Sequence, residues 1–292
     1  MTPEVKEKVA IIGTGRMGSA AAERLSGLGY EVILWNRTRE KAEELAKRIN
    51  ARVAATPFEA VQEAKYGLLF LSDEDAIYGV LSGFHRMDGA VIVNHATITP
   101  QASKRYEGFV KALGGCYVEA PVLGGPSAVR SGKALFVAAG ERICLNTARP
   151  VLEDLAGELI ILGEDTAKAA GLKLAFNSLL IGTVELLAES TILAESYGVD
   201  PETFKDVLSR TVFAAAAEKY IPRMRRDPGE PASFTLRMAM KDLEYALRAG
   251  YPFDIPQPAT AGTHAMYRTA SRIGYANSDY TRIYHAIKGK RD

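Results

Sequence analysis

A strand, a glycine-rich turn, a helix and a second strand are predicted to follow one another between Lys8 and Thr38, and this order constrains the fold most. The segment reads KVAIIGTGRMGSAAAERLSGLGYEVILWNRT. Two apolar runs, residues 9–12 and 32–35, flank a G-x-G-x-x-G motif at residues 13–18. A motif that leaves a strand and opens a helix in this way is the fingerprint of a dinucleotide-binding βαβ unit. The alternative, a glycine-rich turn without function, does not explain the flanking strands.

Each glycine of the motif has a physical role. Gly13 allows the tight turn off the strand, Gly15 leaves room for a pyrophosphate to approach the backbone, and Gly18 lets the helix pack closely on the strand. The helix N-terminus offers free N–H groups and the positive end of its dipole to phosphates. The cofactor-binding residues expected in this turn are Gly13, Thr14, Gly15, Arg16, Met17 and Gly18.

The residues after the second strand favour NADP over NAD. An NAD site usually carries Asp or Glu here to hold the ribose 2′-hydroxyl, whereas this chain has Asn36, Arg37 and Thr38. A carboxylate repels a 2′-phosphate, but an amide, a guanidinium and a hydroxyl can each bond to one. The alternative is that Arg37 and nearby Arg39 are solvated residues at a helix start.

Further strands alternate with helices as far as about residue 163. Apolar runs at residues 67–71, 90–94, 116–119 and 134–139 predict strands, and Ser72-Asp73-Glu74 and Thr99-Pro100 predict helix starts. A Pro- and Gly-rich loop is expected at residues 120–127. The alternation predicts an α/β fold with a doubly wound, mainly parallel sheet, whose loops after Leu71, Asn94 and Ala120 face the ligands.

The pattern becomes helical at residue 166 and stays so. A long helix is predicted from Thr166 to about Tyr197, apolar nearly all round and therefore expected to be buried on most sides. We predict an NADP-binding Rossmann domain at residues 1–164, a long interdomain helix, and an all-α substrate and dimerisation domain at residues 165–292.

Composition excludes several classes of function. A formal net charge of +1 gives no electrostatic footprint for nucleic acid. The charged N-terminus and the lack of an 18-residue apolar run argue against a signal peptide or membrane anchor. Cys116 and Cys144 fit a reducing cytoplasm and are expected to pack as small hydrophobes. The four histidines show no metal-ligand spacing. We expect a cytoplasmic protein without a metal, a membrane or a nucleic-acid partner.

Two polar pairs and one histidine are candidates for chemistry. Lys173 and Asn177 are four residues apart on the long helix and so share one face, which is either solvated or a site for a general acid or base with an orienting amide. Lys241-Asp242, on its own, is usually a solvated charge pair. His95, at the carboxyl end of a strand, is an acid or base in one interpretation and a lone structural histidine in the other.

Together these segments resemble the β-hydroxyacid dehydrogenases, the family of 3-hydroxyisobutyrate dehydrogenase, tartronate semialdehyde reductase and the succinic/glyoxylic semialdehyde reductases. The resemblance covers essentially the whole chain. It rests on spaced motifs in the same order: IIGTGRMG, NRT, LSD, ATITP, EAPVLGGPSAVRSG, GLKLAFN and FTLRMAMKDL.

The resemblance implies roles for individual residues. Lys173 would be the catalytic acid/base, Asn177 would help to bind the reacting substrate, and the Leu123-Gly124-Gly125 turn would hold a substrate carboxylate through backbone N–H groups. Asp242, in the expected substrate-binding set, would fix Lys241. The further contacts to the cofactor would come from Leu71, Ser72, Asp73, Thr97 and Lys241. The resemblance also implies a homodimer or homotetramer.

Two departures from the family pattern bear on the substrate. Leu123 stands where relatives usually carry Ser, and the D-x-S-T loop reads Asn94-His95-Ala96-Thr97, so two hydroxyls are missing. Losing one such hydrogen bond costs roughly 1 kcal/mol or more of carboxylate binding. We expect an NADP(H)-dependent oxidoreductase that interconverts a β-hydroxy acid or related alcohol and its semialdehyde or ketone. The rivals are an imine reductase and a catalytically silent NADP-binding protein with an interaction or sensing role.

Overall fold

The computed structural model describes residues 6–227 and 229–289. Contacts within the chain divide it into two compact units, residues 1–173 and residues 174–292. The division falls inside the long helix α8 (Thr166–Ser196), after Lys173. The domain boundary at residue 164 stays a prediction. The two units are described separately below.

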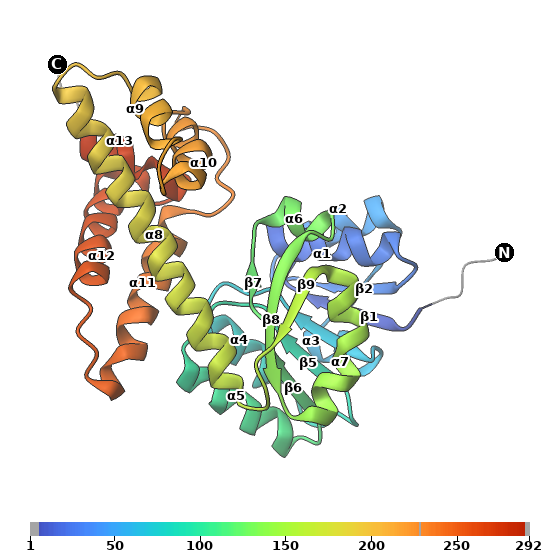
Figure 1. Cartoon of the computed structure of the whole chain (residues 1–292). Helices are drawn as coiled ribbons and strands as arrows, with labels where there is room; N and C mark the ends of the chain where they lie inside the picture. Colours follow the sequence, from blue (N-terminus) through green and yellow to red (C-terminus); the bar gives the residue numbers. More distant parts are fainter. Residues whose placement is uncertain (1–5, 228, 290–292) are drawn as a thin grey trace. The chain divides into compact units, whose positions relative to one another are not determined.

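The first unit is built on one mixed sheet, which is mainly parallel (Figure 1). Its strand order is β3-β2-β1-β4-β5-β6-β8-β7, with β9 paired to β8. Only the β6–β8 and β7–β8 pairs are antiparallel. The strands are β1 (Lys8–Ile12), β2 (Glu31–Trp35), β3 (Arg52–Val53), β4 (Tyr66–Leu69), β5 (Val91–Asn94), β6 (Cys116–Glu119), β7 (Val122–Leu123), β8 (Ala134–Gly140) and β9 (Ala156–Ile161).

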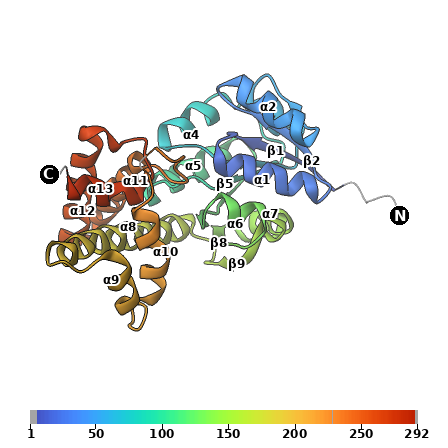
Figure 2. The same cartoon turned by 90° about the horizontal axis from the view of Figure 1, so that it is seen from above.

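Helices cover both faces of this sheet, which confirms the doubly wound α/β prediction (Figure 2). One face packs on α1 (Arg16–Gly27), α2 (Arg39–Ile49) and α7 (Arg142–Leu155). The other packs on α3 (Pro57–Gln62), α4 (Glu74–Leu81) and α5 (Pro100–Ala112). The short helix α6 (Pro126–Arg130) follows β7. Because both faces are covered, the central strands are apolar almost throughout.

The parallel strands end in register, so the loops that follow them start from one edge of the sheet. Ile12 pairs with Leu69, Leu69 with Asn94, and Asn94 with Glu119. The next residues continue this order: the backbone N–H of Phe70 bonds to Ile12, that of His95 to Leu69, and that of Ala120 to Asn94. The predicted ligand-facing loops are therefore gathered at the carboxyl edge.

The second unit is helical, as predicted. It contains the later part of α8 with α9 (Pro201–Leu208), α10 (Ala214–Met224), α11 (Leu236–Gly250), α12 (Pro258–Ala270) and α13 (Ile283–Lys288). Short helices η1 (Tyr251–Phe253), η2 (Ser271–Tyr275) and η3 (Tyr280–Arg282) join them. One core binds α8 to α10, α11, α12 and α13 through side chains such as Val184, Ile221, Leu243 and Ile283.

The prediction that α8 is buried on most sides is wrong. Val184 and Ala188 are fully buried, but Leu179, Leu186 and Leu193 are 72%, 63% and 62% exposed. The helix therefore buries one face only. Its apolar residues are spread around the whole helix, so the sequence did not show which face is buried. By length and composition α8 could also cross a membrane, a property that core helices of soluble proteins share.

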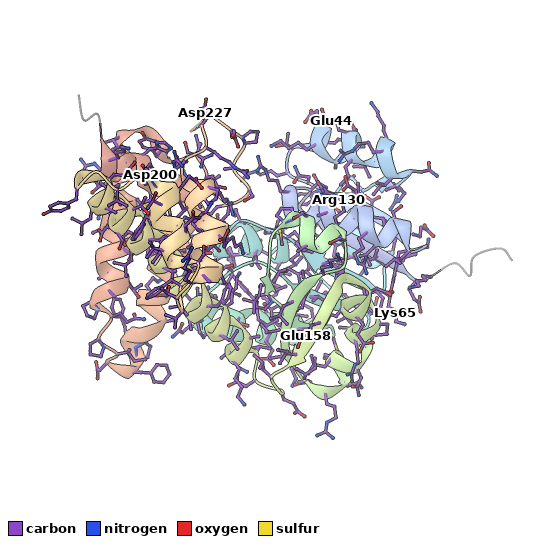
Figure 3. All side chains as sticks on the ribbon, turned by 45° about the horizontal axis from the view of Figure 1, so that its top comes forward. Glu44, Lys65, Arg130, Glu158, Asp200 and Asp227 are labelled. Atoms are coloured by element: carbon purple, nitrogen blue, oxygen red, sulfur yellow. A yellow bond between two sulfur atoms is a disulfide. The ribbon has the colours of Figure 1, made fainter. Side chains whose placement is uncertain are left out.

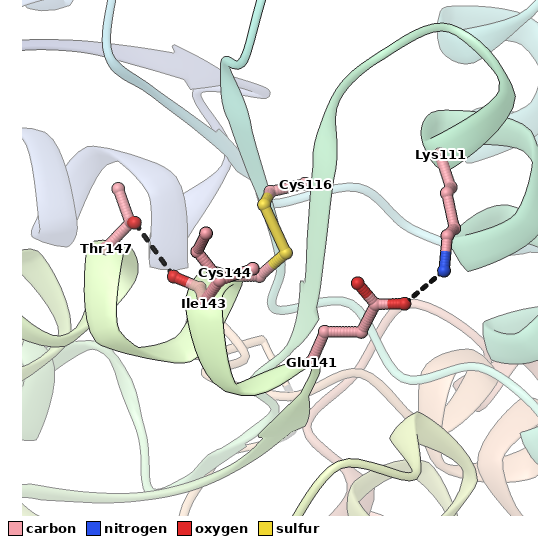
Figure 4. Close-up of a disulfide and its surroundings, with 6 residues drawn as sticks. All are labelled: Lys111, Cys116, Glu141, Ile143, Cys144 and Thr147. Atoms are coloured by element: carbon pink, nitrogen blue, oxygen red, sulfur yellow. Dashed lines mark hydrogen bonds and ion pairs between the residues drawn. A yellow bond between two sulfur atoms is a disulfide. The ribbon is translucent and has the colours of Figure 1, made fainter.

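The prediction that the two cysteines pack as free small hydrophobes is also wrong. Cys116, the first residue of β6, and Cys144, in the first turn of α7, form a disulfide (Figure 4). Their Cα atoms are 5.3 Å apart, within the usual range for such a bond. A separation of 28 residues gave no sign of this pairing. The argument from cysteines for a reducing compartment falls, and the cytoplasmic location stays a prediction.

Candidate functional site

The glycine turn after β1 has the shape that a pyrophosphate requires. Gly13 has a φ of +101°, which L-residues rarely adopt, and a Cβ on Gly18 would lie 1.9 Å from the Gly13 carbonyl oxygen. Nothing lies within 4 Å of the place where a Cβ on Gly15 would be. Gly15 and Arg16 are exposed at the N-terminus of α1, whereas Met17 is half-buried. The turn thus forms an open cradle below free backbone N–H groups, which fits a dinucleotide.

Asn36 joins this turn to the end of β2. Its Oδ1 accepts a hydrogen bond from the backbone N–H of Thr14 at 3.1 Å, and its Nδ2 donates to the carbonyl oxygen of Thr38 at 2.8 Å. Arg37 and Thr38 are exposed beside it. Arg39 forms an exposed ion pair with Glu43 in the first turns of α2, as expected of a solvated residue at a helix start.

A cavity of about 360 Å³ lies next to this region. Thr14 and Ser19 line it from the turn and α1, and its other walls come from α2: Lys41, Glu44, Leu45 and Arg48. Glu44 is labelled in Figure 3. The Thr14 hydroxyl is buried and has no hydrogen-bond partner in the described part of the chain. Lys41, Arg48 and the unsatisfied Thr14 hydroxyl outnumber the one carboxylate, Glu44, so the cavity suits an oxygen-rich group.

The loops after β4 and β5 reach the same edge of the sheet. Leu71 and Ser72 follow β4, and Asp73 caps α4, its Oδ1 accepting from the N–H of Ala76 at 2.9 Å, as predicted. Ser72 donates to the other carboxylate oxygen of Asp73 at 2.7 Å. Thr97 is half-buried in the β5 loop. These residues therefore stand where contacts to a dinucleotide are expected: the loop after β4 is next to the glycine turn, and the loop after β5 is one strand further along the sheet.

Lys173 is held by the loop that was predicted to bind substrate. Its Nζ donates to the carbonyl oxygen of Val122 at 2.7 Å. Leu123 is the next residue, and its half-buried side chain packs against Val137, Ala139 and Ala169. Gly124 and Gly125 follow, both exposed. The lysine and the backbone N–H groups of this turn thus belong to one compact unit.

In the second unit, Asn177 and Asp242 are joined directly. The Asn177 amide donates to Asp242 Oδ2 at 2.6 Å, and both side chains are almost fully buried. The other carboxylate oxygen of Asp242 lies 3.0 Å from the Nζ of Lys241, which also stands 4.9 Å above the ring of Tyr245. The reading of Lys241-Asp242 as a solvated pair is therefore wrong. Asp242 thus accepts a hydrogen bond from the Asn177 amide and forms an ion pair with Lys241.

The sequence analysis missed a buried carboxyl group, that of Glu119, beneath the loops that follow β5 and β6. Glu119, the last residue of β6, accepts hydrogen bonds from Tyr117 at 2.7 Å, Ser103 at 2.8 Å and Asn94 at 2.9 Å. Burial raises the pKa of Glu119 to about 8, although all three donors oppose this. Through Asn94, which also bonds to both backbone polar groups of Ala96, it braces the β5 loop. The sequence signal that could have indicated this group is an acidic residue at the end of an apolar strand.

No metal site accompanies this arrangement in the described ranges 6–227 and 229–289. No group of three or more His, Cys, Asp and Glu residues there could hold a metal ion. The titratable groups at the carboxyl edge include Lys173, Glu119, His95 and Asp73.

Two family models match the chain in succession. Residues 8–163 match the NAD-binding domain of 6-phosphogluconate dehydrogenase. Residues 167–287 match a domain described as NAD-binding of NADP-dependent 3-hydroxyisobutyrate dehydrogenase. The two matches cover most of the chain and correspond to the sheet-based part and the helical part of the structure.

Individual proteins agree with these models. Glyoxylate/succinic semialdehyde reductase 1 of Arabidopsis thaliana is 26% identical over 98% of this chain and 100% of its own length. The solved 3-hydroxyisobutyrate dehydrogenase of Mycobacterium tuberculosis has the same fold, with a TM-score of 0.82 at 23% identity over 97% of this chain and 99% of its own. An imine reductase from Pseudomonas sp. has a TM-score of 0.67 at 25% identity, over 97% and 99%. The chain therefore belongs to the β-hydroxyacid dehydrogenase family, whose members are nicotinamide-dependent oxidoreductases acting on CH–OH groups.

Proposed function

We propose that this protein is an NADP(H)-dependent oxidoreductase that interconverts a β-hydroxy acid, or a related alcohol, with its semialdehyde or ketone. When bound, the reduced nicotinamide supplies the hydride. The chain supplies the proton: the Lys173 ammonium donates it to the substrate oxygen during reduction and accepts it back during oxidation. The products balance, since a carbonyl gains one hydride and one proton to become a CH–OH group.

The observation that carries this proposal is the hydrogen bond from Lys173 to Val122. A general acid must be aimed at the oxygen that it protonates, and a neutral carbonyl holds an ammonium without taking its proton. The same backbone continues into Leu123, Gly124 and Gly125, whose N–H groups are proposed to bind a carboxylate. The acid, Lys173, and the proposed carboxylate site would then both be positioned by the short segment from Val122 to Gly125.

Asn177 and the Asp242–Lys241 pair would complete the machinery. Asn177 lies four residues after Lys173 in α8, so it is expected on the same helix face. Its Nδ2 already donates to Asp242, so the amide orientation is set before any ligand arrives. We infer that Asn177 presents its remaining hydrogen-bonding capacity to the substrate oxygen.

The preference for NADP is supported by the end of β2. Asn36 takes the place of the acid that holds a ribose 2′-hydroxyl in NAD sites, and Arg37 is exposed beside it. Lys41 and Arg48 line the neighbouring cavity. Position 36 carries no carboxylate that would repel a phosphate, and the two cations of the cavity outnumber its one carboxylate, Glu44.

An imine substrate is the second candidate, and Leu123 is the observation that favours it. The leucine side chain contributes to an apolar cluster and cannot replace the hydroxyl that relatives use for a carboxylate. An apolar substrate lacking a carboxylate would lose nothing by this change. The retained Lys173 favours the carbonyl reaction over this alternative.

A substrate panel separates the candidates. NADPH absorbance is followed with semialdehydes, α-keto acids, simple aldehydes and cyclic imines, and NADPH binding is measured separately by fluorescence titration. Turnover of a carbonyl compound supports the proposal, and turnover of imines alone supports the second candidate. If NADPH binds but no compound reacts, the protein is a catalytically silent NADP-binding module.

We also propose that the protein assembles with further copies of itself through α8. Leu179, Leu186 and Leu193 are seven residues apart on its exposed face. A heptad spacing of leucines is typical of a helix that packs along a partner helix. An apolar stripe of this length is seldom left in water.

A further inference from the structure

The ring of His95 is held rigidly at the carboxyl edge of the sheet. It is 7% exposed and directly follows β5. The ring of Phe70 stacks on it at 4.5 Å between centroids, with an interplanar angle of 18°. Phe136 of β8 contacts it edge-on at 5.5 Å and 86°. Both neighbours come from the same unit, so the direction of the imidazole is fixed by packing.

Among the residues that the structure describes, this ring has one polar partner, and that partner defines its tautomer. Nδ1 lies 2.6 Å from the carbonyl oxygen of Ala120. Because a carbonyl can only accept, Nδ1 carries the hydrogen. Burial lowers the pKa of His95 to about 4, so the ring is neutral at pH 7. Nε2 is buried without a hydrogen-bond partner among the described residues. A ring so enclosed donates one hydrogen bond and is poorly placed to exchange protons.

The bonded carbonyl belongs to the segment that carries the Lys173 acceptor. Three successive carbonyl groups in this segment have separate partners. Ala120 accepts from His95, Pro121 accepts from the backbone N–H of Val137 at 3.3 Å, and Val122 accepts from Lys173. Pro121 fixes its own φ, so the orientation of one carbonyl constrains the next. His95 is thus two peptide units away from the group that holds the ammonium.

We propose that His95 is a positioning residue: its Nδ1–H orients the Ala120–Val122 backbone and thereby sets where the Lys173 ammonium points. This inference rests on the proposed role of Lys173 as the acid/base. The catalytic lysine would be aimed by a residue from a different strand, through backbone rather than through a side-chain contact.

Two substitutions of nearly equal shape isolate the hydrogen bond. His95→Asn places an amide N–H close to the position of Nδ1, whereas His95→Leu has the same shape without a donor. Both lose the stacked ring, so the loss of packing cancels in the comparison. We expect kcat of the Leu variant to be about tenfold below that of the Asn variant, because a small misplacement of a catalytic group costs at least this much in rate. KM for NADPH should agree within about twofold, because the glycine turn is untouched.

The His95→Asn and His95→Leu substitutions are then each combined with Lys173→Met. If His95 acts through the lysine, the tenfold difference disappears in this background. Equal kcat values for the Asn and Leu variants with Lys173 present would overturn the inference, and so would a difference that persists without Lys173. If the Leu variant does not fold by circular dichroism, His95→Phe is compared with the wild-type chain instead, since both keep a ring between Phe70 and Phe136 and only the wild type has the donor.

The outcomes also separate this inference from the proposed function. Full activity of Lys173→Met alone refutes the acid/base role, and the positioning role with it. An inactive Lys173→Met together with equal Asn and Leu variants refutes only the role of His95.

Discussion

Replacing Arg37 by Ala should weaken NADPH much more than NADH. The amide of Asn36 already bonds to Thr14 and Thr38, and Arg39 is paired with Glu43 at 2.7 Å. Of Arg37 and Arg39, Arg37 is therefore the one whose guanidinium we expect to meet a 2′-phosphate. A hydrogen bond to a charged group contributes about 1.5–3 kcal/mol, and the exposure of Arg37 puts it at the low end. The expected rise in KM for NADPH is about tenfold.

The assay is initial-rate kinetics with NADPH and with NADH on the same substrate. KM for NADH should change by less than about twofold, because NADH lacks the phosphate. Arg39→Ala is the matched control: it removes the same charge two residues away, from a guanidinium already occupied by Glu43. Equal effects on both cofactors, or equal effects of the two substitutions, would refute the assignment of NADP specificity to Arg37.

Three further predictions concern the disulfide, the buried amide and α8. Reducing the Cys116–Cys144 bond, which closes a loop of 28 residues, should cost about 3–4 kcal/mol and lower Tm by roughly 10 °C; a melt unchanged by reductant, or two free thiols by titration before reduction, contradicts this. Asn177→Leu removes the amide donor to Asp242 and should destabilise the helical unit by about 1–3 kcal/mol in urea unfolding; an unchanged midpoint would show that the bond contributes nothing. Leu186→Glu should dissociate the oligomer in light scattering, with the wild-type chain as control; a monomeric wild type, or one that binds lipid vesicles instead, counts against self-assembly.

Local sequence patterns were sufficient to predict the fold class, because the glycine turn, the apolar runs and the helix-start residues all indicated a doubly wound α/β unit followed by helices. The glycine turn requires a positive φ at Gly13 and no side chain at Gly18, and both requirements are visible in the sequence. The alternation of apolar runs and helices predicted the α/β part, and its absence after residue 163 predicted the helical part. The strands β3, β7 and β9 were missed. The first two have only two residues each, too few for periodicity to appear.

The contacts of the candidate site could not be predicted in the same way. The partner of Lys173 is a backbone carbonyl, which has no sequence signature. The disulfide joins a strand to a helix brought together only by the fold, and the exposed leucines of α8 look identical in sequence to its buried ones. The pairing of Asn177 with Asp242 crosses 65 residues, so the resemblance could name both residues but not their bond.

Replacement of Lys173 tests the central claim most directly. On the best substrate of the panel, Lys173→Met should lower kcat by about 10²–10⁴-fold, the usual contribution of a general acid, while NADPH binds with unchanged Kd. Lys168→Met, the same change at an exposed position of α8, should leave kcat unchanged. Full activity of the Lys173→Met protein would contradict the account.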